Sequence, residues 1–354
     1  MLVFNVMFGR GLGGIEQSML DYHIALSKTD TKVVSFAHPD AKILKKFAKA
    51  GIPSNEIIKL KNMGQWDVFA KILIAQLLKK FKPDAVIAHG NRAINLFHKA
   101  CKKHNVPLIG VTHNYKLQHF HKCDAAFAIT ENLAEEVRKE IGTEHIFNIP
   151  HMINIAPHLQ PPPKPFANPP IIGVMSRMVP EKGLELFLRA LEHLKSHHIE
   201  FKAKIGGDGD ERKNLEDLIQ ELGLGDYVEL LGWQNDKADF YSSIDIFCLP
   251  SLRESFGIVI LEAYKAALPI VSTRTHGPNE IIHHNFTGIL TEVDIVELAE
   301  GLEKLIKDEK LAHKLGKQGY EYALANFCSN VIGKKIRDSI SEITQNHAKL
   351  KKSA

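Results

Sequence analysis

Two basic residues near the middle of the chain stand where fixed positive charge could bind phosphate. Arg177 and Lys182 belong to the segment SRMVPEKG, which follows the apolar run Ile171 to Met175 and precedes a helical pattern. The apolar run predicts a strand, so both side chains are expected at its carboxyl end, where open parallel sheets bind ligands. Two cations held there could clamp a diphosphate.

Two glutamates further along could complete such a site. Glu254 and Glu262 lie in PSLRESFGIVILE, where a predicted strand gives way to a helix expected to begin near Phe256. The N–H groups and the positive end of the helix dipole would face the same region. Eight residues at about 1.5 Å each span about 12 Å. One carboxylate could hold sugar hydroxyls and the other a ribose, with a diphosphate against the intervening amides.

A glycine-rich turn follows the first apolar run. The residues GRGLGG from Gly9 to Gly14 satisfy G-x-G-x-x-G and open a helical pattern bearing Glu16, as in dinucleotide-binding folds. That fingerprint also needs an acid at the end of the second strand, but the next acid here is Asp40, beyond a proline. What remains is a turn whose amides can approach a phosphate closely, or a plain strand-to-helix connection.

Short apolar runs alternate with longer helical patterns, which predicts an α/β fold with parallel sheets covered by helices on both faces. In the first half the expected strands are Leu2 to Phe8, Lys32 to Phe36, Ala85 to Ala88, Leu108 to Val111 and Ala125 to Ile129. In the second half they are Ile171 to Met175, Phe201 to Ile205, Tyr227 to Leu230, Ile246 to Leu249 and Ile270 to Ser272. Helices are expected at Ile15 to Ser27, Ala93 to Lys103 and Gly183 to Lys195.

Seven of the sixteen prolines lie between Pro157 and Pro170, which predicts a semi-rigid linker. A chain of 354 residues is also long enough for two domains, each with its own core. We therefore expect two tandem doubly wound, Rossmann-like domains facing across a cleft. Their bounds are 1–156 and 171–328, with the linker at 157–170 and a helix with a basic tail at 329–354.

Together these motifs resemble the retaining family 4 glycosyltransferases of the two-Rossmann (GT-B) class. The resemblance covers essentially the whole chain and is most specific from Ile171 to Leu290. Its motifs are Gly13-Gly14-x-Glu16, Arg177 with Lys182-Gly183, Gly207 to Gly209, Gly232-Trp233, the E-x7-E segment from Glu254 to Glu262, and the loop Gly277 to Glu280.

The resemblance implies transfer of a hexose or N-acetylhexosamine from a nucleotide-diphosphate sugar, with UDP favoured over GDP, with retention and without a metal or other cofactor. The first domain would bind a glycan or lipid-linked acceptor, and the second the donor. The basic first half suggests a lipid-linked or phosphorylated acceptor, and therefore a place in envelope polysaccharide or lipopolysaccharide biosynthesis. Because His276 and Asn279 depart from the small residues usual in the family's donor-sugar loop, the identity of the sugar is not implied.

The resemblance also implies roles for single residues. Arg177 and Lys182 would neutralise the leaving diphosphate, Glu254 would lie near the donor sugar, and His113 would lie near the reacting centre. The other expected donor contacts are Gly13, Gly14, Gly207, Asp208, Trp233, Ser255, Phe256, Gly257, Ile258, Val259 and Glu262, the last as the ribose clamp.

Metal-binding patterns are weak. Asp208-Gly209-Asp210 imitates the D-x-D that chelates manganese in the other main class of glycosyltransferases, but its glycine turn after a strand favours a turn or donor contact. His119 and His121 lack a third well-spaced ligand. The four cysteines are scattered without a C-x-x-C pair, so neither a zinc ribbon nor a disulfide frame is expected.

Charge is distributed unevenly, since basic residues exceed acidic ones before Pro165 and acidic ones prevail after it. Two predicted helices mix lysines with apolar residues, as in helices that rest on anionic membranes, although a solvated helix face is the simpler alternative. Their lysines are Lys42, Lys45, Lys46, Lys49, Lys79, Lys80 and Lys82. No aromatic-rich basic signature predicts nucleic-acid binding. With no signal peptide or apolar span apparent, we expect a cytoplasmic protein, peripheral to the membrane if the basic helices bind it.

Two other function classes stay open at this stage. A nucleotide-sugar epimerase of the same architecture would convert the donor with no acceptor present. A non-catalytic sugar-nucleotide or lipid-surface binding module would bind without turnover, although the presence of both cations and both glutamates argues against it.

Overall fold

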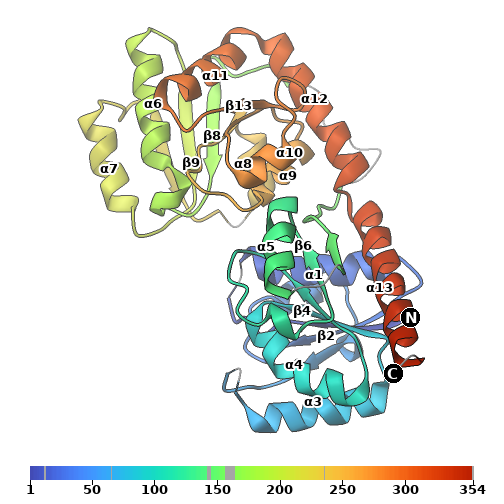
Figure 1. The fold of residues 1–354 in the computed structure, drawn as a ribbon. Helices are drawn as coiled ribbons and strands as arrows, with labels where there is room; N and C mark the ends of the chain where they lie inside the picture. Colours follow the sequence, from blue (N-terminus) through green and yellow to red (C-terminus); the bar gives the residue numbers. More distant parts are fainter. Residues whose placement is uncertain (12, 65, 142–144, 156–163, 235, 353–354) are drawn as a thin grey trace. The chain divides into compact units, whose positions relative to one another are not determined.

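The computed structural model describes all residues except 12, 65, 142–144, 156–163, 235 and 353–354 (Figure 1). It forms two compact units, one of Met1–Met152 with Cys328–Ala354 and one of Ile153–Phe327. Each unit is a parallel sheet with helices between successive strands, so the predicted α/β architecture is confirmed. The first half of the predicted proline linker, residues 157–163, lies outside the described residues.

The N-terminal unit has a seven-stranded sheet in the order β3-β2-β1-β4-β5-β6-β7. Its strands are β1 (Leu2–Val6), β2 (Lys32–Ala37), β3 (Ile57–Lys59), β4 (Ala85–His89), β5 (Leu108–Val111), β6 (Ala125–Ala128) and β7 (Ile146–Asn148). Its helices are α1 (Gly14–Ser27), α2 (Leu44–Lys49), α3 (Val68–Phe81), α4 (Asn91–His104), α5 (Glu131–Ile141) and α13 (Ser329–Lys352). The order steps outward from β1 in both directions, as in doubly wound sheets.

Side chains alternate between the two faces of this sheet. Val3 and Val33 face a core that includes α1 and α13, whereas Phe4 and Phe36 face the opposite way and contact the rings of Phe81 and Phe97. These strands are therefore buried on both faces, which explains why they appear in the sequence as near-continuous apolar runs.

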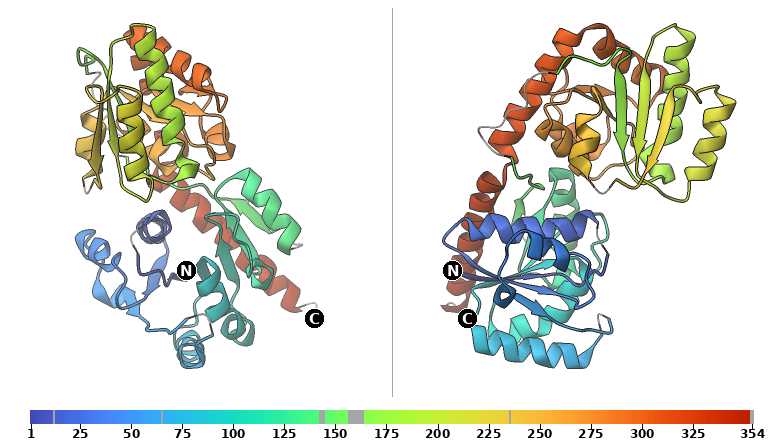
Figure 2. Two further views of the ribbon diagram at one scale, coloured as in Figure 1. Left: turned by 90° about the vertical axis from the view of Figure 1, so that its left-hand side faces the viewer. Right: turned by 180° about the vertical axis from the view of Figure 1, so that it is seen from behind.

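The C-terminal helix α13 belongs to the first unit. Helix α13 packs beside α1 (Figure 2). Its buried residues Ile332, Ile336, Ile340 and Ile343 recur at helical spacing and join the core that contains residues of α1. Gly333 allows the close approach, since a Cβ there would lie 2.5 Å from the carbonyl oxygen of Ala25 in α1. Helix α13 is thus a core element of the N-terminal unit.

The second unit has a six-stranded parallel sheet in the order β10-β9-β8-β11-β12-β13. Its strands are β8 (Ile171–Met175), β9 (Lys202–Gly206), β10 (Val228–Gly232), β11 (Ile246–Leu249), β12 (Ile270–Thr273) and β13 (Ile289–Thr291). Its helices are α6 (Leu184–Ser196), α7 (Arg212–Glu221), α8 (Lys237–Ser242), α9 (Ile258–Lys265), α10 (His276–Ile281), α11 (Ile295–Lys307) and α12 (Glu309–Asn326). Strands β8, β9, β11 and β12 supply buried residues to one core with α6 and α11.

None of the helices in the described part of the chain is both long enough and apolar enough to cross a bilayer.

If α13 is part of the N-terminal core, Ile340→Ala should destabilise that unit selectively, because removing a buried isoleucine side chain costs about 2–5 kcal/mol. Hydrogen exchange of the full chain should then speed up in peptides from Met1–Met152 but not in those from Ile153–Phe327. Val331→Ala, at an exposed position of the same helix, is the matched control. Equal loss of protection in both units would contradict the assignment.

Candidate active site

The carboxyl ends of neighbouring strands in the C-terminal unit bring the predicted donor residues together. The turn after β8 contacts the turn after β9, where the Met178 N–H donates to the Asp208 carbonyl at 2.9 Å. It also contacts the loop after β11, where the N–H of Leu252 donates to the Glu181 carbonyl at 3.0 Å. Motifs up to 72 residues apart in the sequence are therefore adjacent in the fold.

Lys182 and Glu254 form an ion pair at the centre of this region. The Nζ of Lys182 lies 2.6 Å from Oε2 of Glu254, and both side chains are largely buried, at 17% and 15% exposed. An ammonium at this depth loses part of its hydration, and the carboxylate compensates for that loss. The pair fixes a positive charge at the strand edge, where it would otherwise move on a flexible stem.

The helix after this loop begins later than predicted. Its first residue is Ile258, not Phe256, because Gly257 takes φ +90° and serves as its N-cap. Among the described residues, the N–H groups of Gly257, Ile258 and Val259 have no acceptor. The Phe256 N–H instead points to Oε1 of Glu254 at 3.5 Å. The predicted run of donor amides from Phe256 to Val259 thus starts one residue later, at the positive end of the α9 dipole.

Two glycines permit these turns to pack closely. A Cβ at Gly183 would lie 2.0 Å from the Pro250 carbonyl oxygen, and one at Gly207 would lie 1.8 Å from that of Ser176. Both glycines also have positive φ, at +64° and +126°, which other residues rarely adopt. Gly183 and Gly207 are therefore structural requirements for the arrangement around Lys182.

Glu262 occupies a different environment from Glu254. It lies on α9, where Oε2 accepts a 2.9 Å hydrogen bond from the Tyr241 hydroxyl and Oε1 pairs with Lys237, both from α8. Burial, followed by the neighbouring carboxylate, raises the pKa of Tyr241 well above its usual value, so the hydroxyl stays a donor. The carboxylate is held in a fixed orientation and remains about one fifth exposed.

The other predicted donor residues lie around the same strand ends. Arg177 is mostly exposed and reaches Glu181 at 3.7 Å, so unlike Lys182 it is not fixed by burial. The Asp208 carboxylate accepts from the N–H of Gly209, which makes it a turn-forming group. Trp233 is exposed after β10, and Ser255 is partly buried before α9. Asn279, which departs from the family pattern, accepts a hydrogen bond from Arg274.

In the N-terminal unit, the glycine turn is partly filled by Glu16. The Gly13 N–H donates to Oε2 of Glu16 at 2.9 Å, and a Cβ at Gly9 would lie 2.4 Å from Oε1. Gly13 caps α1, and Gly14 begins it with open space around its Cα. One of the amides expected to approach a ligand is therefore occupied in this structure by the carboxylate of a capping box.

His113 belongs to a stack of three histidines that the sequence did not predict. His89 lies between Asn5 and His113, and the His113 ring stacks on that of His151. The Asn5 side-chain carbonyl accepts from Nε2 of His89 at 2.8 Å, because the amide nitrogen of Asn5 is committed to the Met19 carbonyl. Nδ1 of His89 must then accept from Nε2 of His113 at 3.1 Å. This leaves Nδ1 of His113 as an unprotonated, buried acceptor without a partner among the described residues.

Burial keeps the stack neutral. Loss of hydration lowers the pKa of His89 to about 3 and that of His151 to about 4. It also lowers the pKa of His113 well below its usual value, with the neighbouring histidines adding to the effect. His113 is thus a neutral hydrogen-bonding group at physiological pH rather than a source of positive charge.

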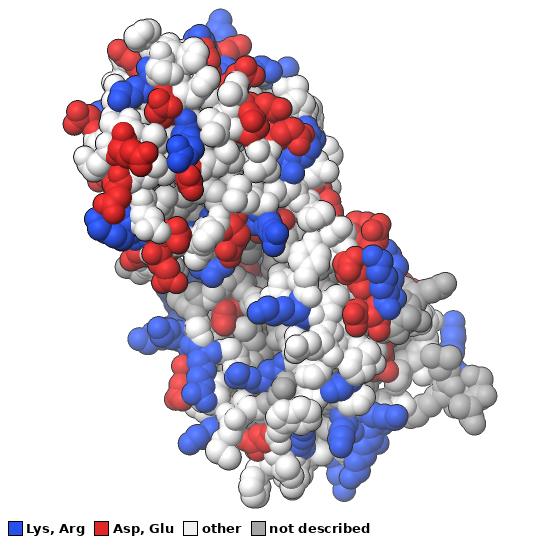
Figure 3. Space-filling model, turned by 60° about the vertical axis from the view of Figure 1, so that its left-hand side comes forward, with Lys and Arg blue, Asp and Glu red and all other residues white. Residues whose placement is uncertain are grey.

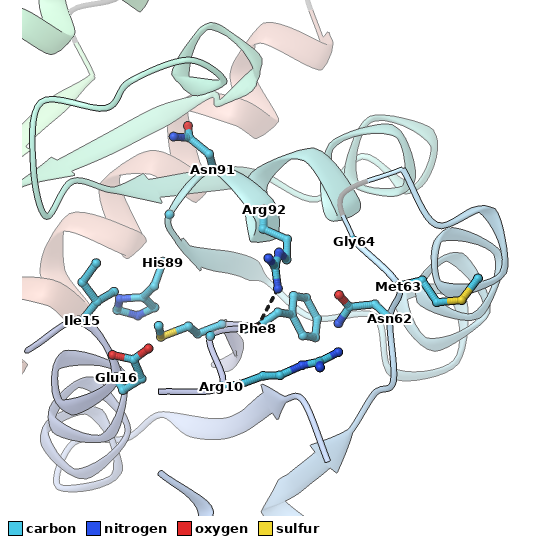
Figure 4. Close-up of a pocket in the computed structure, with 13 residues that line it drawn as sticks. Phe8, Arg10, Ile15, Glu16, Asn62, Met63, Gly64, His89, Asn91 and Arg92 are labelled. Carbon is cyan, nitrogen blue, oxygen red and sulfur yellow. Dashed lines mark hydrogen bonds between the residues drawn. The ribbon is translucent and has the colours of Figure 1, made fainter. Parts of the chain in front are cut away.

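His89 also lines a pocket of about 650 Å³ in the N-terminal unit (Figure 4). Arg10 and Arg92 project into it from opposite sides, and Arg92 is anchored by a 3.2 Å hydrogen bond to the Phe8 carbonyl. Glu16, Asn62 and Met63 complete the wall. Two arginines beside hydrogen-bonding side chains suit a polar ligand that carries negative charge.

The sequence carries only a weak sign of the buried histidine network around His89. Asn5 and Ser35 are polar residues inside otherwise apolar strands, and each bonds within the buried network around His89. No group of three or more His, Cys, Asp or Glu side chains in the described ranges is arranged to hold a metal ion.

The neutral histidines make stability depend on pH. When folding lowers the pKa of a histidine, its contribution to the free energy of unfolding is fully present above the unfolded-state pKa of about 6.5. That contribution is lost as the pH falls toward the folded-state pKa, because the unfolded chain then binds a proton that the folded chain does not. For His89 the loss should be about 1.4 kcal/mol per pH unit between roughly pH 6 and 4. His89→Gln should flatten the pH profile of the N-terminal unit's unfolding free energy by that slope, measured by hydrogen exchange. The exposed His121→Gln is the control, and parallel profiles for His89→Gln and the unchanged chain would refute the assignment.

Known protein families match both halves of the chain. The model described as Glycosyltransferase Family 4 matches residues 12–156, and the model described as Glycosyl transferases group 1 matches residues 158–322. The chain is 26% identical over 285 residues to the lipopolysaccharide core biosynthesis glycosyltransferase LpsE of Rhizobium meliloti, covering 77% of this chain and 80% of LpsE.

Two solved structures share the fold over nearly the whole chain. A glycosyltransferase from Rickettsia africae superposes with a TM-score of 0.82 at 21% identity, covering 98% of this chain and 99% of that one. HepE of Anabaena, crystallised with UDP and glucose, superposes with a TM-score of 0.78 at 20% identity, covering 97% of this chain and 100% of that one. With both halves matched by family models and the whole by this fold, the chain belongs to the group 1 glycosyltransferases of the GT-B class and is a glycosyltransferase.

Proposed function

We propose that this enzyme transfers a hexose or N-acetylhexosamine from a UDP-sugar to a glycan or lipid-linked acceptor in envelope polysaccharide or lipopolysaccharide biosynthesis, with retention and without a metal. The observation that carries the proposal is the Lys182–Glu254 pair beside the start of α9. The similarity to LpsE and the UDP and glucose bound by HepE support the choice of pathway and nucleotide.

Charge stabilisation is the task proposed for the Lys182 region. As the bond between the sugar's anomeric carbon and the diphosphate breaks, negative charge grows on the leaving oxygen. Lys182 and the N–H groups of Ile258 and Val259 are held in place before the reaction, so they stabilise this charge without reorganising. Arg177 adds a second cation that can move onto the diphosphate when it binds.

Retention needs the acceptor oxygen to form its bond on the same face of the sugar that the diphosphate leaves. The acceptor proton then passes to an oxygen of the departing phosphate, so no side chain has to act as a covalent nucleophile. Glu254 positions Lys182 and the sugar hydroxyls, and Glu262 holds the ribose. Neutral His113 acts near the sugar as a hydrogen-bond acceptor through Nδ1, because its single N–H is donated to His89.

Lys182→Ala should lower turnover about 10²- to 10³-fold, the effect of removing one preorganised group that stabilises transition-state charge. UDP release from UDP-glucose, UDP-galactose and UDP-N-acetylglucosamine is the measurement, in the presence of EDTA because the proposal dispenses with metal. Lys213→Ala removes an exposed lysine paired on the surface of α7 and is the matched control. Unchanged turnover in Lys182→Ala, or loss of all turnover in EDTA, would reject the mechanism.

Glu262→Gln should weaken UDP binding about 10- to 100-fold, because hydrogen bonds to a charged group are worth about 1.5–3 kcal/mol. Calorimetric titration with UDP and with GDP measures this, and UDP should bind more tightly to the unchanged enzyme. Glu216→Gln, which alters an exposed ion pair on α7, is the control. Equal UDP affinity in both variants would remove Glu262 from the nucleotide site.

A further inference from the structure

The N-terminal unit exposes an unusual concentration of apolar side chains around the start of α3. Half of the large hydrophobic residues that the described chain exposes fall between Met63 and Phe81. Met63, Trp66 and Phe69 are 89%, 69% and 82% exposed. Contiguous apolar surface of this kind marks an interaction site in a folded protein. We name it the Met63–Leu73 surface, made of Met63, Trp66, Val68, Phe69, Ile72 and Leu73.

Folding alone does not require this surface. Helix α3 already buries Ala70, Ile74 and Leu78 within the unit, one residue per turn. Phe69, Ile72 and Leu73 lie at the complementary spacing and face outward. The helix is therefore apolar on two faces, and only one of them has a partner in the described structure.

The acid on this segment is used internally. Asp67 caps α3, with one carboxylate oxygen accepting from the Ala70 N–H at 2.9 Å and the other from the Met63 N–H at 2.8 Å. These bonds lower the pKa of Asp67. They also hold Met63 against the first turn of the helix, so that the apolar residues before and within α3 form one surface.

Two lysines lie over exposed aromatic rings in and beside this surface. The Lys71 ammonium lies 5.4 Å from the centre of the Trp66 ring, and the Lys80 ammonium lies 5.5 Å from the centre of the Phe81 ring. Loss of hydration, together with Lys99 and Lys122, lowers the pKa of Lys71. In Figure 3, Lys and Arg also outnumber Asp and Glu over the N-terminal unit, in the lower part of the view. An apolar centre with Trp and a lysine rim suits the interface of an anionic bilayer.

We propose that the Met63–Leu73 surface inserts into the headgroup region of an anionic membrane, with the surrounding lysines binding lipid phosphates. Met63 and Gly64 also line the pocket that contains Arg10 and Arg92 (Figure 4). The docked surface thus continues into the pocket wall, so a lipid-anchored acceptor with an anionic head can enter the pocket without leaving the bilayer. This assignment of the pocket rests on the proposed function, whereas the docking itself does not.

Co-sedimentation of the full chain with vesicles tests the docking. The unchanged protein should sediment with vesicles containing one quarter phosphatidylglycerol and at least tenfold less with pure phosphatidylcholine, and 0.5 M NaCl should weaken the binding. Phe69→Ser combined with Leu73→Ser should reduce binding to anionic vesicles at least tenfold. Phe286→Ser, at an exposed phenylalanine of the other unit, is the matched control and should bind as the unchanged protein does.

Further readouts separate the possible results. Trp66 fluorescence, read in a Trp233→Phe background, should shift to shorter wavelength with anionic vesicles. UDP affinity of the double variant should equal that of the unchanged chain, so that loss of vesicle binding is distinguishable from failure of the donor site. Absence of sedimentation, or equal sedimentation of the double variant, would overturn the proposal. A third result would also overturn it: the unchanged protein forms a dimer in solution without vesicles, and the double variant loses the dimer but still binds vesicles. The surface would then join two copies of the chain.

Discussion

The structure depends on one geometric constraint: in a parallel sheet every strand's carboxyl end reaches the same edge, and the chain must leave that edge through a loop. Residues at these loops become neighbours however far apart they are in the sequence. Lys182, Gly207 and Glu254 follow three adjacent strands of one sheet. In the other sheet, Asn5 lies in β1, His89 ends β4 and His113 follows β5, and these strands are also adjacent. Both polar clusters of this enzyme arise from the same property of the backbone.

Close backbone contact then fixes the loops. Gly183 and Gly207 admit carbonyl oxygens where a side chain would stand, and Gly277 packs its Cα against the backbone of Phe256. Buried ion pairs alone are weak evidence of stability, because dehydration offsets much of their attraction. The Lys182–Glu254 pair is therefore better understood as a device for positioning charge, held by loops whose geometry is set by glycine.

The sequence predicted the strand that precedes the Glu254 loop at its observed bounds, because Ile246–Leu249 is a continuous apolar run buried on both faces. Three strands of only three residues, β3, β7 and β13, escaped prediction because such short segments show no periodicity. The start of α9 was displaced because Gly257 adopts a left-handed conformation that composition does not reveal. The partners of Glu262 lie 21 and 25 residues before it, and the sequence gives no reason to pair them with it.

The path of the chain through its two units has a consequence for biosynthesis. The first unit is interrupted at Met152 and resumes at Cys328, so the second is, topologically, an insertion into it. During translation the inserted unit is complete before α13 emerges, whereas the earlier-synthesised sheet must wait for the isoleucines of the last helix. The unit that is begun first therefore matures last, with part of its apolar surface uncovered until α13 has been synthesised.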